Sequence, residues 1–308
     1  MIKDKKCPLC NSAQVHLIES ISADSINKAY KNNFRINNAV SADYFNYCQC
    51  DICKLLFFNP METGGEGFYE MLQEFDWYYM AEKYEYSIAK KHLLKTGNLL
   101  EIGAGNAAFS VFSGVENYTG LEFNQKAISS ALKKGIKLLK QSIEEHASTG
   151  CLYDTVVTFQ VLEHVKNPKE FISGCIKCLK PGGRLIISVP SLYGFAGKAL
   201  NNILNMPPHH VTHWAIDTFE KIAEINNLKI LSIEYEPVAL YHRSWAKKSI
   251  LENKFRKIMR METSLLDMSF KSNLISRAAH LLGIILPIRL DNILGHTVVI
   301  VYEKKLLY

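Results

Sequence analysis

The stretch LLEIGAGNAAF, residues 99–109, decides the fold of this chain. An apolar strand pattern runs into a turn that contains Gly103 and Gly105, and a short helical pattern follows. Glycines at a strand-to-helix turn let the backbone approach a ligand closely, and amides at the helix start can bind it. The turn therefore predicts a nucleotide site. On the glycines alone, an ordinary tight turn and a nicotinamide-dependent oxidoreductase both stay open.

Two acidic residues narrow the choice of nucleotide. Glu101 precedes the first glycine by two residues, where a carboxylate would repel a pyrophosphate and attract an ammonium group. Glu122 ends the next strand pattern, YTGLE (118–122), where a carboxylate can accept hydrogen bonds from ribose hydroxyls. The pair predicts a ligand with an ammonium at one end and a ribose in the middle, which counts against a nicotinamide cofactor.

Residues 97–236 alternate strand patterns with helix patterns. The apolar run TVVTFQVL (155–162) predicts a buried strand, and QKAISSALKKG (125–135), closed by a glycine, predicts a helix. Such alternation is typical of an α/β fold with a parallel sheet covered by helices on both faces. The late run GHTVVIVYEK (295–304) predicts a strand paired with KILSIEYE (229–236), which makes residues 237–294 an insertion.

Four blocks in this order and spacing resemble class I S-adenosylmethionine-dependent methyltransferases: LLEIGAGNAAF, YTGLE, YDTVVTFQVLEHV and LKPGGRLIISVP, within residues 97–190. Each block alone is a weak signal, and their combination carries the resemblance. The resemblance implies a seven-stranded, Rossmann-like sheet with an antiparallel last strand, a place that GHTVVIVYEK suits. It also implies an enzyme whose methyl donor is S-adenosyl-L-methionine.

The resemblance also implies a set of cofactor-binding residues: Glu101, Gly103, Ala104, Gly105, Glu122, Phe123, Ser142, Ile143 and Gln160. Glu101 would face the methionine amino group, and Glu122 would hold the ribose hydroxyls. Ser142 and Ile143 stand where the family lines the adenine, although an aspartate is commoner there. Gln160 would close the floor of the site.

Five cysteines lie within the first 53 residues. CPLC (7–10) and CDIC (50–53) are two CxxC pairs, and two such pairs can supply four thiolates to one tetrahedral Zn²⁺ ion. We therefore predict a zinc site with the ligands Cys7, Cys10, Cys50 and Cys53. Cys48 is left as an alternative ligand. A closed four-thiolate site has no open position, so its role would be structural.

This arrangement resembles bacterial methyltransferases that carry an N-terminal zinc ribbon, several of which act on sugars or other small molecules. In that setting the ribbon supports the substrate side of the site. A third pair, CIKC (175–178), lies within a helix pattern, and we interpret it as core packing.

The segment NMPPHHVTHW (205–214) gathers three histidines after the strand of the LKPGGRLIISVP block. A hydroxyl or acidic-carbon acceptor must lose a proton, so a base is needed near the carboxyl ends of the strands. In related ribbon-bearing sugar methyltransferases a histidine block here supplies the base, which implies His210 as the catalytic residue, with His209 second. The HHxxH spacing leaves a second metal site as an alternative, and packed or capping histidines as another. We interpret His164, in VLEHV, as a structural residue beneath the cofactor.

Two further segments are candidates for the substrate side. FDWYYMAEKY (75–84) precedes the sheet as a lid would, and Tyr79 is counted among the candidate catalytic residues. Packing of these aromatics into the core is the alternative. The basic amphipathic stretch 245–290 is interpreted as a substrate-capping helical insertion, with a peripheral surface for a membrane or a partner as the alternative.

Composition sets outer limits on these interpretations. The chain has 308 residues, 48% of them hydrophobic, and a net charge of +6, as expected for a soluble globular protein with a mildly basic surface. No secretory signal is visible, and the longest apolar run, LLGIILPI (281–288), is too short to span a bilayer. A cytoplasmic protein is therefore expected.

Together these patterns predict three parts: a zinc ribbon at 1–60, an aromatic lid and helical linker at 61–96, and an S-adenosylmethionine-binding methyltransferase domain at 97–308. The insertion at about 237–294 belongs to the third part. The expected reaction is methylation of a small molecule on oxygen or carbon, such as a sugar or nucleotide-sugar, without nucleic acid as a partner. An RNA-modifying or RNA-binding protein that uses the ribbon as reader is the alternative.

Overall fold

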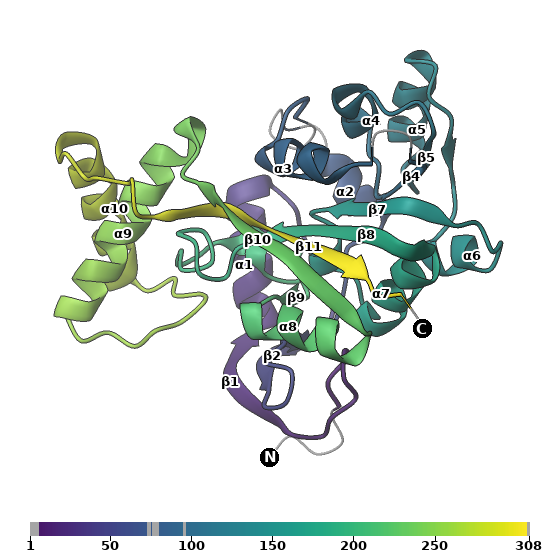
Figure 1. The fold of residues 1–308 in the computed structure, drawn as a ribbon. Helices are drawn as coiled ribbons and strands as arrows, with labels where there is room; N and C mark the ends of the chain where they lie inside the picture. The colour runs from purple at the N-terminus through teal and green to yellow at the C-terminus, as the bar shows by residue number, and fades with distance from the viewer. Residues whose placement is uncertain (1–5, 73–74, 76–79, 95–96, 307–308) are drawn as a thin grey trace.

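A computed structural model describes residues 6–72, 75, 80–94 and 97–306 of the chain. Within these ranges the strands form two sheets, one of seven strands and one of four (Figure 1). The seven-stranded sheet has the order β10-β11-β8-β7-β4-β5-β6. Its strands are β4 (Leu99–Ile102), β5 (Tyr118–Leu121), β6 (Leu138–Leu139), β7 (Tyr153–Phe159), β8 (Leu179–Pro190), β10 (Leu228–Pro237) and β11 (Leu294–Lys304).

The strand directions follow the predicted topology. β6, β5, β4, β7 and β8 pair in parallel, whereas β11 runs antiparallel to both β8 and β10. The predicted pairing of GHTVVIVYEK with KILSIEYE is confirmed, since Tyr235 pairs with Val298 and Ile230 with Tyr302. The predicted Rossmann-like, seven-stranded sheet is thereby confirmed as well.

Helices cover both faces of this sheet because its central strands are apolar on both sides. On β11, Val298 and Ile300 pack with Phe219 of α8 on one face, and Val299 packs with Ile88 of α3 on the other. The helices and short 3-10 turns of this part are α3 (Tyr84–His92), α4 (Ala108–Ser113), α5 (Gln125–Lys133), α6 (Ile143–Ala147), η1 (Leu162–His164), α7 (Pro168–Lys177), η2 (Ile203–Asn205) and α8 (Ile216–Ile225).

The second sheet has the order β1-β2-β3-β9. Three of its strands come from the N-terminal part, with two helices: β1 (Val15–Ser22), α1 (Ala23–Phe34), β2 (Tyr44–Cys50), β3 (Leu56–Asn59) and α2 (Glu66–Leu72). The fourth strand, β9 (Thr212–His213), comes from the histidine segment and pairs antiparallel with β3, Leu56 with His213 and Phe57 with Thr212. No local pattern in the sequence predicted this pairing.

The two sheets also share apolar packing. Cys50, Leu55 and Phe57 of the N-terminal part belong to the same buried cluster as Trp214 and Ile300. The N-terminal part therefore has no separate core on this side, and it holds the end of the segment that follows β8, at Thr212–Trp214, against the main sheet.

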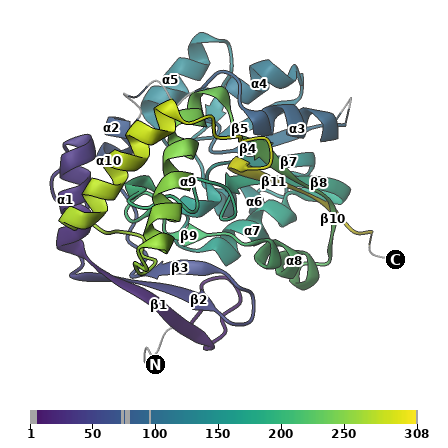
Figure 2. The ribbon, with the colours of Figure 1, turned by 90° about the vertical axis from the view of Figure 1, so that its left-hand side faces the viewer.

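The predicted insertion before the last strand forms a helical pair (Figures 1 and 2). After the turn η3 (Leu240–His242), α9 (Arg243–Ile258) and α10 (Phe270–Ile285) lie side by side, at the opposite end of the molecule from α6. The buried Arg256 closes the connection between them: one guanidinium nitrogen contacts the carboxylate of Asp267 at 2.7 Å, and the other donates to the carbonyl of Glu262. Across the described residues, we find no helix with the length and hydropathy needed to cross a membrane.

We predict that Tyr47→Phe lowers the free energy of unfolding by about 1–3 kcal/mol, because the Tyr47 hydroxyl and His213 Nδ1 are buried hydrogen-bond partners at 2.7 Å. The change would leave His213 Nδ1 buried without its partner. Urea unfolding followed by circular dichroism measures the effect. Tyr44→Phe, on the exposed side of the same strand, is the matched control and should change stability by less than about 0.5 kcal/mol. Equal stability of the two variants would contradict the prediction.

Candidate active site

A cavity of about 1030 Å³ joins the glycine turn to the histidine segment. Pockets for one small ligand usually measure about 300–1000 Å³, so this cavity has room for two. Of the residues expected to bind the cofactor, its wall includes Glu101, Gly103, Ala104, Gly105, Glu122, Phe123 and Gln160. His209 and His210 line the same cavity. The fold thus brings together two groups of predicted site residues that lie about a hundred positions apart in the sequence.

The turn after β4 requires glycine at its first position. Gly103 has a φ of +70°, and a Cβ there would lie 2.4 Å from Cγ2 of Val161. The amides of Gly103 and Ala104 both donate to the carbonyl of Leu121, at 2.9 and 3.0 Å, which fixes the turn against β5. A side chain at Gly103 would therefore push the turn away from the floor of the cavity.

Glu101 is a buried acid at the end of β4. Its carboxylate accepts a hydrogen bond of 2.6 Å from the hydroxyl of Tyr118. Burial raises the pKa of Glu101 to about 8, a rise that Glu122 adds to and that Tyr118 and Lys83 oppose. A carboxyl of this kind favours a bound cation, because the cation replaces the lost hydration of its charged form.

Glu122 ties the glycine turn to the end of β5. Its Oε2 accepts the amide of Gly105 at 2.8 Å, and its Oε1 accepts the amides of Phe123 and Asn124, each at 2.8 Å. A carboxylate has about four acceptor positions, so Oε2 keeps capacity for one more donor on the cavity side. The Glu122 carboxylate therefore holds the glycine turn in place and can still accept a hydrogen bond from a ligand.

Three other expected cofactor residues take distinct places. Ser142 caps α6, where its hydroxyl accepts the amide of Glu145 and its own amide is bound by the Glu145 carboxylate. Ile143 is buried in the main core beside Gly174. Neither lines the cavity as the described residues form it. Gln160 does line it, with a left-handed φ of +55°, a conformation that costs a non-glycine residue energy and is common at functional sites.

The two predicted catalytic histidines are adjacent and stacked. The rings of His209 and His210 lie 4.4 Å apart between centroids at an angle of 19°. Nδ1 of His209 donates to the carbonyl of Leu204 at 2.8 Å, and Nδ1 of His210 bonds Oδ1 of Asn205 at 2.9 Å. Burial and the neighbouring imidazoles hold the pKa of both rings well below the usual range, so both are neutral at neutral pH.

His164 joins this pair, a contact that its interpretation as a structural residue beneath the cofactor did not include. Its ring centroid lies 4.6 Å from that of His209 and 4.9 Å from that of His210, and its Nδ1 donates to the carbonyl of His209 at 2.6 Å. One ring nitrogen from each of the three histidines lies within 4.8 Å of the others. The histidine cluster is defined here as His164, His209 and His210.

Glu163 faces this cluster and was missed from the sequence. It is 1% exposed, and its Oε1 lies 3.9 Å from Nε2 of His164 and 3.9 Å from Nε2 of His210. Among the described residues neither of its oxygens has a hydrogen-bond partner. Burial raises the pKa of Glu163 to about 8. A charged residue inside the apolar block VLEHV was the signal that could have identified it.

The other predicted residues of the substrate side lie apart from the cluster. His213 is fully engaged elsewhere: Nδ1 contacts the Tyr47 hydroxyl at 2.7 Å, and Nε2 contacts the carbonyl of Asn205 at 2.9 Å. The HHxxH spacing therefore does not describe the cluster, because β9 turns its third histidine towards the N-terminal sheet. Tyr79 lies outside the described residues, as does Tyr78.

The helical insertion supplies one wall of the cavity. Tyr241, His242 and Trp245 line it, and the rings of His242 and Trp245 lie 5.6 Å apart between centroids. Acidic side chains outnumber basic ones in the described part of the cavity wall. Among the described residues, the wall contains two lysines, Lys83 and Lys140, and six glutamates, namely Glu66, Glu85, Glu101, Glu122, Glu163 and Glu236.

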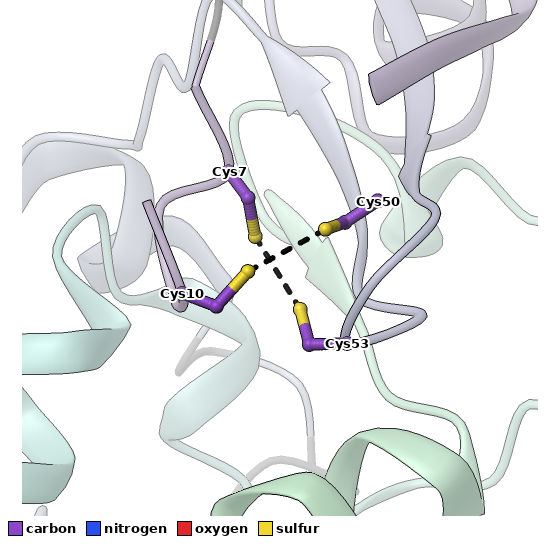
Figure 3. Close-up of side chains that lie close together, drawn as sticks. All are labelled: Cys7, Cys10, Cys50 and Cys53. Carbon is purple, nitrogen blue, oxygen red and sulfur yellow. Dashed lines mark hydrogen bonds between the residues drawn. The ribbon is translucent and has the colours of Figure 1, made fainter. Parts of the chain in front are cut away.

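The predicted zinc ligands form a separate group outside the cavity. The thiols of Cys7, Cys10, Cys50 and Cys53 converge from two segments, the turn at 7–10 and the end of β2 with the turn after it (Figure 3). The sulfur–sulfur distances are 3.4 Å for Cys7–Cys53 and 3.5 Å for Cys10–Cys50. All four sulfurs lie within 4.8 Å of one another. Cys48 lies on the same strand as Cys50, but its thiol points to the carbonyl of Asn46 at 3.5 Å.

Comparison with known proteins shows which family has a sequence similar to this chain. A family model described as a methyltransferase domain matches residues 72–233, which is more than half of the chain. A ubiquinone biosynthesis O-methyltransferase of Vibrio atlanticus is 30% identical over 185 residues, covering 54% of this chain and 75% of that protein. The enzyme of the same name from Dechloromonas aromatica is 28% identical over 160 residues, 46% of this chain and 69% of that protein.

A solved structure shows the same fold. The crystal structure of a SAM-dependent methyltransferase from Archaeoglobus fulgidus superimposes with a TM-score of 0.50 and 18% identity, over 77% of this chain and all of that one. The fold and the glycine turn define a Rossmann-like methyltransferase domain. The chain belongs to this methyltransferase domain family and is an S-adenosylmethionine-dependent methyltransferase.

Proposed function

We propose that the chain methylates a hydroxyl oxygen of a small molecule that lies between the glycine turn and the histidine cluster. The observation that carries this proposal is the shared cavity, which has the Glu101–Gly105 turn at one side and His209 and His210 at another. Its size accommodates a donor and an acceptor together. The name of the similar Vibrio and Dechloromonas enzymes, O-methyltransferases of ubiquinone biosynthesis, supports oxygen as the acceptor atom.

The donor fits the residues around the glycine turn. Glu101 is a buried carboxyl suited to the donor's ammonium group, and Oε2 of Glu122 has capacity for a ribose hydroxyl. Gly103 keeps the turn open, because a Cβ there would collide with Val161. When bound, S-adenosylmethionine supplies an electrophilic methyl group on a sulfonium sulfur. The protein then has to hold the acceptor oxygen in line with that carbon and promote the loss of its proton.

The histidine cluster is placed to promote this loss of a proton. Its rings are neutral, and Nδ1 of His210 is held by Asn205, which directs Nε2 away from the Asn205 side chain. His210 remains the first candidate for the catalytic residue, with His209 second. Both line the cavity, which a proton acceptor for a bound hydroxyl must do.

The cavity wall favours an uncharged acceptor. The described part of the wall carries only two basic side chains, Lys83 and Lys140, to bind a diphosphate or a nucleic acid backbone, so the nucleotide-sugar and RNA alternatives lose support. The rings of Tyr241 and Trp245 offer apolar faces on which a sugar or an aromatic ring can pack. We therefore propose a neutral, ring-containing alcohol or phenol, a class that includes free sugars and glycosides.

We further propose that residues 1–60 form a zinc ribbon whose role is to hold the histidine segment. The four converging thiols fit a tetrahedral zinc ion, because zinc binds thiolates at about 2.3 Å and leaves no open position in such a set. Cys50 lies at the end of β2, which pairs with β3, and β3 in turn pairs with β9. The ribbon would thereby act on the substrate side without touching the substrate.

Glu101 predicts a pH dependence for donor binding. An ammonium ligand binds the ionised carboxylate, so below the free-state pKa of about 8 binding must expel a proton from Glu101. The affinity for S-adenosylhomocysteine should therefore fall as the pH decreases from 8 to 6, by up to about tenfold per unit. Calorimetry in buffers of different ionisation enthalpy measures both the affinity and the released proton. Glu101→Gln should bind weakly with a flat profile, and an unchanged slope in that variant would contradict the assignment.

His210→Ala should lower the rate of methyl transfer by about 10²–10⁴-fold, the usual contribution of proton transfer by a positioned side chain. Affinity for S-adenosylhomocysteine should stay the same, since His210 lies outside the glycine turn. The assay uses radiolabelled donor with a panel of phenols, free sugars and nucleotide-sugars. His280→Ala, an exposed histidine of α10, is the control. Full activity of His210→Ala would exclude its role, and transfer to nucleotide-sugars alone would contradict the proposed acceptor class.

Removing the ribbon ligands should impair catalysis more than donor binding. A Cys7→Ser, Cys50→Ser variant should contain one zinc ion per chain fewer than the wild type, and its methyl transfer should fall while it still binds S-adenosylhomocysteine. Elemental analysis and calorimetry measure these quantities. Cys151→Ser, at an exposed cysteine, is the matched control and should keep the wild-type zinc content. A double variant with unchanged zinc content would refute the ligand set.

A further inference from the structure

The proposed role of the histidines as proton acceptors does not explain why the carboxyl group of Glu163 is buried beside them. A carboxyl group that is 1% exposed and has no hydrogen-bond partner among the described residues costs free energy in a folded protein. Such a group persists where it serves a ligand. Nε2 of His164 and Nε2 of His210 each lie 3.9 Å from Oε1 of Glu163, which is too far for hydrogen bonds.

The orientation of the three histidine rings also indicates a bound ligand. Each ring uses Nδ1 to contact a carbonyl oxygen: His164 contacts His209, His209 contacts Leu204, and His210 contacts the side chain of Asn205. A carbonyl can only accept, so Nδ1 carries the proton and Nε2 carries the lone pair. Histidines that bind metals are held in this way, with the second ring nitrogen donating to a carbonyl or carboxylate.

We propose that His164, His209 and His210 bind a divalent first-row transition-metal ion in the wall of the cavity, with Glu163, which lies 3.9 Å from two of these rings, as the fourth ligand. Neighbouring ligands of a tetrahedral zinc ion, each about 2.1 Å from the metal, lie about 3.4 Å apart. The separations from Glu163 Oε1 to Nε2 of His164 and Nε2 of His210 are 3.9 Å, and one nitrogen from each of the three histidines lies within 4.8 Å of the others, so binding requires these atoms to approach by up to about 1.4 Å. The site is distinct from the four thiols of the ribbon.

The ligand set indicates which metals bind. Imidazole nitrogens suit zinc, iron, cobalt and nickel, whereas magnesium and calcium prefer oxygen ligands alone. Three histidines and one carboxylate leave room for a further ligand from the cavity, which all four residues line. The site therefore has the open character of a catalytic metal centre, in contrast to the closed thiol group.

The function of this ion deepens the proposed methyl transfer and rests on it. A cation beside the acceptor's hydroxyl lowers the pKa of that hydroxyl, so that the proton leaves to water and the ionised oxygen attacks the methyl carbon. As that bond forms, the carbon–sulfur bond of the donor breaks and its electron pair stays on sulfur. His210 then acts as a metal ligand, and its loss lowers the rate by removing the cation.

Metal content tests the site directly. The full chain is saturated with Zn²⁺, freed of excess ion by gel filtration, and examined by native mass spectrometry and elemental analysis. The wild type should carry one zinc ion per chain more than a His164→Asn, His210→Asn variant. His242→Asn, at a histidine that lines the same cavity but is not part of the cluster, is the control and should keep the wild-type content. Equal zinc content in the wild type and the double variant would overturn the proposal.

Cobalt distinguishes the two sites within one protein. Co²⁺ at the histidine cluster should give visible absorption that is lost in the double variant, without a change in the thiolate-to-cobalt charge-transfer bands of the ribbon. Glu163→Gln, which keeps the volume of the side chain, should weaken this binding and guards against a double variant that fails to fold. Cobalt spectra that are identical in the wild type and Glu163→Gln, with a folded double variant that also matches, would overturn the site.

Activity separates this proposal from the proposed function. Methyl transfer by a protein stripped of the second ion, with its ribbon zinc retained, should fall and return when Zn²⁺ or Co²⁺ is added. Undiminished transfer after stripping would overturn the metal site and leave the methyl transfer itself standing. A bound second ion without transfer to any acceptor would instead contradict the proposed acceptor class.

Discussion

The short antiparallel pairing of β3 with β9 is the contact on which the candidate site depends. Two residue pairs, Leu56–His213 and Phe57–Thr212, fasten the segment after β8 to the N-terminal sheet. The amide of Phe58 extends the pairing by donating to the carbonyl of Val211 at 2.9 Å. His209 and His210 lie immediately before this anchor. A histidine segment in an unanchored loop would pay the entropy of ordering at every encounter with a substrate, whereas here folding has already ordered it.

The anchor also explains why a cysteine-rich module is attached to this methyltransferase domain. β9 contributes two residues to a sheet whose other three strands come from the first sixty residues. An isolated two-residue strand has too few contacts to hold its own conformation. The module supplies the partner strand, the apolar cover over Trp214, and the hydroxyl of Tyr47 for His213. Its contribution to the site is therefore positional, and it acts through backbone pairing.

The order of the main sheet could be predicted because its signals are local. The apolar runs, the glycine turn with Glu101, and the strand with Glu122 each occupy fewer than a dozen consecutive residues, and βαβ connections leave few possible topologies. The paired cysteines were equally readable, since their spacing alone defines a turn with two thiols. The roles of Glu163 and His164 in the candidate site could not be predicted from the sequence, because they depend on the residues that pack against them in the folded chain. Ser142 illustrates the converse: its place beside the adenine stays a prediction from the family motif, and the structure adds that the residue caps α6.

The sequence by itself determined the class of fold, the methyl donor and the grouping of the cysteines, since each follows from residues that are neighbours in the chain. Only the tertiary structure decided which histidines lie together. The spacing HHxxH grouped His209 and His210 with His213, but β-sheet geometry turns His213 towards Tyr47 and brings His164 from η1 into its place. The physical reason is that alternate residues of a strand face opposite sides, and that a 3-10 turn at the end of β7 meets the histidine segment only when both sheets have formed.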